Sequence, residues 1–116
     1  MFTFQRLDVY RCSLEFLSLC PSLLDAAPRG NGALADQLRR AAMSIPLNIA
    51  EAEGRIGDAD KARIYSIARG SAMECAAILE ALMTLKVVDE PVCRKGMELL
   101  ERVVSMLTRM CRAHRE

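Results

Sequence analysis

Tryptophan is absent from the sequence, and only 4% of its 116 residues are aromatic. The chain also has only four prolines and six glycines. β folds draw on aromatic and β-branched residues and on many turns rich in proline and glycine, so this composition argues against them. The apolar residues, 52% of the chain, are mainly Leu, Ala, Ile, Val and Met, which are typical of packed helices. We therefore expect an all-α protein, and the length suits a single domain spanning residues 1–116.

Long apolar runs are missing as well. The longest uncharged ones, residues 16–24 and 41–50, are far shorter than the roughly 18 residues that a membrane span requires. The N-terminal region resembles a signal peptide in outline, since Arg6 and Arg11 precede a leucine-rich stretch. However, Glu15 interrupts its apolar part, and helical periodicity continues through it. We expect a cytoplasmic protein without a membrane partner.

The sequence has no recognisable set of catalytic or metal-binding residues. Its five cysteines are odd in number, and no two have a spacing typical of a metal site: Cys12, Cys20, Cys75, Cys93 and Cys111. The only histidine is His114, and no Ser/His/Asp set, paired-carboxylate site or phosphate-binding loop is visible. We expect reduced thiols in a cytosolic helical core, no metal, no cofactor and no enzymatic activity.

Excess charge of one sign is also lacking, because the formal net charge is +1. Strong binding to nucleic acid by the whole surface is therefore not expected, whereas a local contact is compatible with the sequence. Residues 102–116 form the one clearly basic segment. The candidates for phosphate contact are five arginines: Arg39, Arg40, Arg109, Arg112 and Arg115. The alternative is that these arginines only lie on solvated helix faces.

Apolar residues recur at spacings of three and four in four segments, which predicts helices at about 4–20, 33–53, 58–86 and 90–114. Gly54 is well placed to end the second helix. Asp58 is well placed to cap the start of the third helix and Asp89 that of the fourth. Pro91 suits the first turn of the fourth helix. The third helix shows a seam that would face the core: Ile64, Ala68, Ser71, Cys75, Ile78, Leu82 and Leu85. Short links between four helices predict an antiparallel up-down-up-down four-helix bundle.

Pro46 lies inside the second predicted helix, where a proline costs about 3 kcal/mol. The helical pattern nevertheless continues on both sides of it in two rows. The apolar row is Ile45, Ile49, Ala52 and Ile56, and the polar row is Ser44, Asn48, Glu51 and Arg55. A break would destroy both rows, so we expect a continuous helix that bends at Pro46.

Small residues gather in the third predicted helix between Arg69 and Glu74, with Gly70 among them. A glycine inside a helix costs up to about 1 kcal/mol relative to alanine, which suggests that another backbone approaches closely. We expect the second helix to pack there. Its polar row would then join Arg69 and Glu74 in a structural network that fixes helix register and subunit contacts. The alternative is a surface that contacts a ligand or RNA.

Residues 37–55, QLRRAAMSIPLNIAEAEGR, followed by residues 67–75, IARGSAMEC, resemble a known family. The family that they resemble consists of four-helix-bundle proteins encoded in intervening sequences of bacterial large-subunit ribosomal RNA genes. The accessory variability determinant of diversity-generating retroelements is a related, strongly basic member. The opening stretch of residues 7–16 also matches. The family pattern falls on Ser44, Pro46, Asn48, Glu51, Gly54, Arg55, Arg69, Gly70, Ser71 and Glu74.

The resemblance implies a homopentamer and an association with RNA or with a nucleoprotein partner. Our leading hypothesis is a non-enzymatic oligomeric module of this kind. One alternative is a purely structural protein–protein scaffold. The other is a ribonuclease of the HEPN type, because Arg109 and His114 form an Arg-x-x-x-x-His pattern that resembles the HEPN signature. In such an enzyme His114 would act as a general acid or base on the RNA 2′-hydroxyl.

Overall fold

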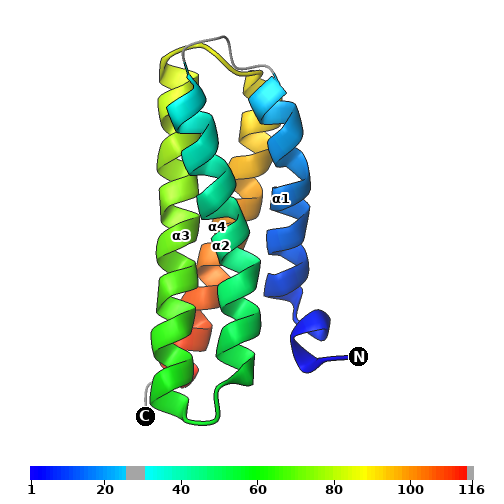
Figure 1. Cartoon of the computed structure of the whole chain (residues 1–116), viewed down its shortest axis with the longest axis vertical. Helices are drawn as coiled ribbons and strands as arrows, with labels where there is room; N and C mark the ends of the chain where they lie inside the picture. The colour runs from blue at the N-terminus through cyan, green and yellow to red at the C-terminus, as the bar shows by residue number, and fades with distance from the viewer. Residues whose placement is uncertain (26–30, 115–116) are drawn as a thin grey trace.

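The computed structural model describes residues 1–25 and 31–114, and over these residues it contains four long helices and no strand. A short 3₁₀ turn, η1 (Thr3–Arg6), precedes α1 (Asp8–Asp25), α2 (Gly32–Gly54), α3 (Asp58–Thr84) and α4 (Glu90–Ala113). Successive helices run in opposite directions, as Figure 1 shows. The molecule measures 45 × 25 × 21 Å. The predicted all-α, antiparallel up-down-up-down four-helix bundle is confirmed.

The four helices occupy the corners of a square. α1 packs against α2, α2 against α3, α3 against α4, and α4 against α1. The two diagonal pairs, α1 with α3 and α2 with α4, have no comparable contacts. Surfaces on α2 and α4 therefore face different sides of the molecule. None of the helices in the described part of the chain combines the length and the apolar character that crossing a membrane requires.

The first helix differs from the predicted range of 4–20. Residues 3–6 form the separate turn η1, where the backbone N–H of Phe2 donates to Gln5 Oε1 at 2.8 Å. Leu7 is extended, so the α-helix begins only at Asp8, whose charge suits a helix N-terminus. At the other end α1 continues through Pro21 to Asp25. Pro21 lies on the exposed side of α1, where water can hydrogen-bond the carbonyl group that the proline leaves free.

The end of α2 and the start of α3 also correct the sequence analysis in two places. α2 ends at Gly54 as predicted, but the chain is then extended at Arg55, so Ile56 is 99% exposed rather than in the core. Gly57 is the N-cap of α3, and Asp58 is its first helical residue. The predicted caps at the start of α4 are confirmed, because Asp89 is its N-cap and Pro91 lies in its first turn.

α3 ends at Thr84, two residues earlier than predicted, because Lys86 adopts a left-handed backbone conformation with φ 58°. The N–H groups of Lys86 and Val87 donate to the carbonyl oxygens of Met83 and Leu82, which closes the helix in a Schellman motif. Leu85 is left 54% exposed and does not belong to the core seam. The buried row of α3 uses Ala72 where the prediction had Ser71.

The close approach that the sequence predicted at Gly70 is found at Gly96 instead. A Cβ at Gly70 would meet no atom within 4 Å, since this residue faces open space. A Cβ at Gly96 would lie 3.1 Å from Leu79 Cδ1 and 3.2 Å from Phe16 Cε1. All three of these side-chain positions are buried. Gly96 therefore lets α4 approach α1 and α3 in the core.

α2 is one helix from Gly32 to Gly54, and Pro46 lies inside it. The predicted continuity through Pro46 is confirmed, while the predicted bend stays a prediction. Pro46 is itself buried, together with Ile45, Ile49 and Ala52 of the same helix. Burial of the proline ring explains how the fold tolerates the lost hydrogen bond, because the ring contributes apolar contacts in exchange.

Candidate functional site

The polar row of α2 meets α3 through a pair of serines. The hydroxyl oxygens of Ser44 and Ser71 lie 2.8 Å apart, and either can donate. Asn48 Nδ2 donates both to Ser44 Oγ and to the Ser44 carbonyl oxygen, at 2.8 Å each. The side-chain amide of Asn48 therefore supplies a hydrogen-bond donor to a backbone carbonyl group in the helical turn that contains Pro46. These three residues link α2 to α3 through satisfied, partly buried hydrogen bonds.

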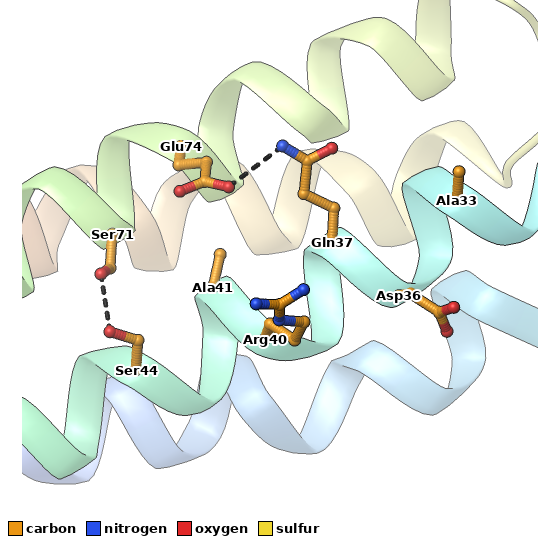
Figure 2. A pocket seen from close by; sticks show the side chains of 8 residues that line it. All are labelled: Ala33, Asp36, Gln37, Arg40, Ala41, Ser44, Ser71 and Glu74. Atoms are coloured by element: carbon orange, nitrogen blue, oxygen red, sulfur yellow. Dashed lines mark hydrogen bonds between the residues drawn. The ribbon is translucent and has the colours of Figure 1, made fainter.

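A polar groove extends from this serine pair toward the start of α2 (Figure 2). Its volume is about 540 Å³. Ser44 and Ser71 lie at one end, and Ala33 and Asp36 lie at the other. Glu74 lines the α3 side, where it accepts a hydrogen bond from Gln37 Nε2 at 3.2 Å. Arg40 also lines the groove and makes no hydrogen bond or ion pair with any residue that the structure describes.

The far end of the polar row forms a separate cluster near the link between α2 and α3. Arg55 Nη2 lies 2.9 Å from Glu51 Oε2, and Arg55 Nη1 lies 3.5 Å from Asp60 Oδ2. The hydrogen bond to Glu51, with the nearby charge of Asp60, raises the pKa of the Arg55 guanidinium. All three side chains are well exposed, so the cluster contributes little to stability.

Arg69 does not hydrogen-bond to the polar row of α2. Its Nε donates to Thr108 Oγ1 at 2.8 Å, so it joins α3 to α4. The reason is helical geometry, because successive residues are about 100° apart and Arg69 lies two positions before Ser71. With Ser71 directed at α2, Arg69 is on a different side of α3. The residues predicted to form one network are thus divided among four sets of contacts.

The candidate phosphate-binding arginines lie in two separate places. Arg39 and Arg40 are exposed on α2, and Arg39 pairs with Asp36 at 2.9 Å. Arg109 and Arg112 are exposed in the last turns of α4, where Arg109 Nη1 donates to Ser105 Oγ at 3.1 Å. Arg115 lies outside the described residues. Because α2 and α4 are not neighbours, one subunit does not bring the four described arginines together.

Sequence reasoning missed a cluster at the end of the bundle where α2 ends, α3 begins and α4 ends. The Tyr65 hydroxyl hydrogen-bonds to the Glu53 carboxylate. Burial, and then this hydrogen bond, raise the pKa of Tyr65. The His114 ring stacks on Tyr65 with centroids 5.7 Å apart, and its Nδ1 lies 3.2 Å from Asp58 Oδ1. The contacts span up to 56 positions along the chain, so local periodicity could not reveal them.

Lys61 completes this end of the bundle. Its Nζ donates to the carbonyl oxygens of Ala52 at 3.3 Å and Glu53 at 3.2 Å, which caps the C-terminus of α2. The two residues of the HEPN-like pattern have different partners, because Arg109 bonds to Ser105, whereas His114 contacts Asp58 and Tyr65. Within residues 1–25 and 31–114, no group of three or more His, Cys, Asp or Glu side chains is arranged to hold a metal ion.

Burial makes two of the cysteines, Cys20 and Cys75, poorly reactive. All five lie in the described part of the chain, where none forms a disulfide, and four of them are buried. Burial raises the pKa of Cys20 to about 11 and, with a smaller effect of the nearby Cys20, that of Cys75 to about 12. Because the thiolate is the reactive form, these two thiols are poor nucleophiles at neutral pH.

Comparison with known protein families finds a match over most of the chain. The family model described as 23S rRNA-intervening sequence protein matches residues 5–109. The match includes the polar row of α2, the serine pair and Arg69. No curated protein matches the chain.

Proposed function

The chain belongs to the 23S rRNA-intervening sequence protein family, and we propose that it is a non-enzymatic module that assembles into a homopentamer and binds RNA through the assembled ring. RNA within a nucleoprotein is included in this proposal. The observation that carries the assembly is the exposure of large apolar side chains in the middle of α2 and α3. The number of subunits comes from the family resemblance.

Exposed apolar side chains at helix ends are common, but those at mid-helix are harder to explain in a monomer. Met43 and Leu47 on α2 are 47% and 61% exposed, and Ile67 and Met73 on α3 are 44% and 50% exposed. Neither pair lies near a chain terminus or a link. Exposed apolar side chains that gather on a surface are typical of protein contacts. In a homo-oligomer, neighbouring copies of the chain would cover these side chains with their own apolar surface.

RNA binding is supported by the position of the tail arginines. Arg109 and Arg112 are exposed in the last turns of α4, and in a symmetric ring every subunit would present them at the same end. One subunit with a net charge of +1 attracts RNA weakly. Five copies of the same small basic patch, close together, would give a local positive surface that a single subunit lacks.

The contacts of the polar residues support a module without catalysis. The Ser44–Ser71 and Gln37–Glu74 hydrogen bonds join α2 to α3, and Asn48 bonds to Ser44 within α2, so these side chains serve to fix the packing of the two helices. His114 is occupied by Asp58 and Tyr65. We also assign the protein to the cytoplasm, because buried thiols outside any disulfide suit a reducing compartment.

The test is the binding of a structured RNA by the purified protein across a salt series. Binding should weaken steeply as salt rises, because each phosphate contact releases counterions. The variant R109Q/R112Q should bind more weakly at low salt and show a shallower salt dependence. The control R94Q/K95Q removes two positive charges from the other end of α4, where both residues are exposed, and should retain the wild-type slope. Absence of wild-type binding at low salt would refute the RNA proposal and leave a protein scaffold.

A further inference from the structure

α2 carries an apolar ridge on its outer surface. Met43 and Leu47 are four residues apart, so they lie one above the other on the same side of the helix. Both are substantially exposed, and they line a shallow depression that Arg40 also borders. We refer to Arg40, Met43 and Leu47 as the α2 ridge.

The other side of the molecule has an apolar groove between α3 and α4. Its volume is about 250 Å³, and its lining includes Met73 from α3 with Met97, Leu100 and Val104 from α4. Glu101 also lines it. We refer to these five residues as the α3–α4 groove. A groove lined by flexible methionine and branched side chains can accept an apolar ridge of adaptable shape.

The ridge and the groove belong to different faces of the bundle. α2 and α4 occupy diagonal corners of the square and do not pack against each other. One copy can therefore place its ridge in the groove of a second copy while its own groove stays open for a third. Such a head-to-tail contact is heterologous, and repetition of it forms a ring when the rotation closes.

The ridge and the groove also lie at the same height in the bundle. α2 and α4 run in the same direction and begin at the same end of the molecule (Figure 1). Leu100 is one residue closer to the start of α4 than Met43 is to the start of α2. The same offset of one residue relates Val104 to Leu47. At a rise of about 1.5 Å per residue, these pairs differ in height by about 1.5 Å. Subunits related by an axis parallel to the helices would thus bring ridge and groove together.

The charges beside the two surfaces are opposite. Within the part of the chain that the structure describes, neither Arg40 nor Glu101 makes an ion pair or side-chain hydrogen bond. Counted in the same way from the helix starts, Glu101 comes three positions later than Arg40. This offset corresponds to about 4.5 Å along the axis, which an arginine side chain can span.

We propose that the α2 ridge of one subunit packs into the α3–α4 groove of the next copy, with Arg40 of one paired with Glu101 of the other. The proposal rests on the homo-oligomer proposed above and identifies the contact that builds it. It also assigns Arg40 to the subunit interface, which leaves Arg109 and Arg112 for RNA.

Two single substitutions and their mixture test the contact. L47D places a charge on the ridge, and M73D places one in the groove. Both positions are half-exposed or more, so the subunit should still fold. Native mass spectrometry should find each variant alone at the monomer mass of 12.9 kDa. An equal mixture should form a dimer of twice that mass and nothing larger, because one intact ridge meets one intact groove.

The control is L14D, which places the same charge at a partly exposed leucine of α1 outside both surfaces and should keep the wild-type mass. A charge exchange gives an independent test. R40E and E101R should each shift assembly to higher protein concentration by tenfold or more, and the double variant should recover most of this loss.

The outcomes separate this proposal from the one it rests on. A wild-type protein that stays monomeric at micromolar concentration overturns the homo-oligomer and, with it, the contact. A wild-type oligomer whose mass is unchanged by L47D and M73D keeps the homo-oligomer and overturns the contact. If M73D assembles alone while L47D stays monomeric, two ridges contact each other. This result would also overturn the proposed contact between ridge and groove.

Discussion

Ser44 of α2 and Ser71 of α3 share a hydrogen bond of 2.8 Å between their hydroxyl oxygens, and the buried residues of both helices are mostly apolar. The two residues are 27 positions apart in sequence. Asn48 donates a second hydrogen bond to the Ser44 hydroxyl. Removal of the Ser44 hydroxyl therefore also deprives Asn48 of a partner, whereas removal of the Ser71 hydroxyl does not. This difference can be measured.

We predict that S71A lowers the free energy of unfolding by about 1 kcal/mol, the usual net value of one hydrogen bond, and that S44A lowers it by about 1–2 kcal/mol, because Asn48 also loses a partner. The double variant S44A/S71A should cost less than the sum of the two, since the shared bond can be lost only once. Urea unfolding at a fixed protein concentration provides the measurement. Strict additivity would show that the hydroxyl pair contributes nothing.

Gly70 and Gly96 make a matched pair for a second prediction, because both lie inside helices. G70A should raise the free energy of unfolding by up to about 1 kcal/mol, since alanine favours the helix and the Cβ meets no atom. G96A should lower it by about 1 kcal/mol, because crowding against Leu79 and Phe16 outweighs the gain in helix propensity. The midpoints of thermal or urea unfolding decide this. A stabilised G96A would show that the core can yield at Leu79.

The sequence predicted the fold well because its signals are local. The spacing of apolar residues, the glycine at position 54 and the Asp89–Pro91 pair each act over a few residues, and α2 and α4 begin and end within one residue of the predicted ranges. The errors lie where a local preference was overridden. The first helix was predicted to stop near residue 20, but α1 continues through Pro21, and α3 was predicted to reach residue 86, where Lys86 adopts a left-handed conformation that usually selects glycine.

The candidate site was harder to predict because its contacts are distant in sequence. The polar row was visible as a spacing, but the partner of Arg69 depends on which side of α3 faces α4, and that is fixed only by packing. The Tyr65–Glu53 and His114–Asp58 contacts join helix ends that meet only in the folded bundle. Sequence periodicity alone carries no information on such pairs.

The buried thiols give a prediction for alkaline pH. Cys20 and Cys75 have pKa values of about 11 and about 12 in the folded protein, against 9.0 for an exposed thiol. In the unfolded chain the thiols lose their protons above pH 9 while the folded chain keeps them, so the free energy of unfolding should fall as pH rises from about 9 to 11. The loss near pH 11 should reach about 2 kcal/mol for Cys20 and nearly 3 kcal/mol for Cys75.

The variant C75A isolates one of these contributions. It should be less stable than wild type at pH 7, because a buried side chain is shortened, but its stability should fall less between pH 9 and pH 11. The difference between the two proteins therefore narrows at high pH. Urea unfolding at pH 7, 9, 10 and 11 under reducing conditions measures it. An equal decline in both proteins would contradict the burial of a protonated Cys75 thiol.

Pro46 gives a prediction about α2. P46A restores a backbone donor for the Ala42 carbonyl, which favours the helix by up to about 3 kcal/mol, but it also removes a buried ring and the stiffness that proline gives the unfolded chain. We expect these effects to offset, with a change in the free energy of unfolding of about 1 kcal/mol or less. Far-ultraviolet circular dichroism should show unchanged or slightly increased helicity. A loss of about 2 kcal/mol or more would mean that packing of the ring dominates.

The end of the bundle where Tyr65 meets Glu53 supports the last prediction. Y65F keeps the buried ring and its stacking with His114 but removes the hydroxyl that bonds to the Glu53 carboxylate. It should lower the free energy of unfolding by about 1–2 kcal/mol, because a hydrogen bond to a charged group is lost and a partly buried carboxylate keeps no replacement donor. The matched control is Y10F, since Tyr10 makes a ring contact with Phe4 and no side-chain hydrogen bond among the described residues. Y10F should change stability by less than about 0.5 kcal/mol. Urea unfolding of both variants at pH 7 compares them directly, and equal effects of Y65F and Y10F would show that the Tyr65–Glu53 bond does not hold this end of the bundle together.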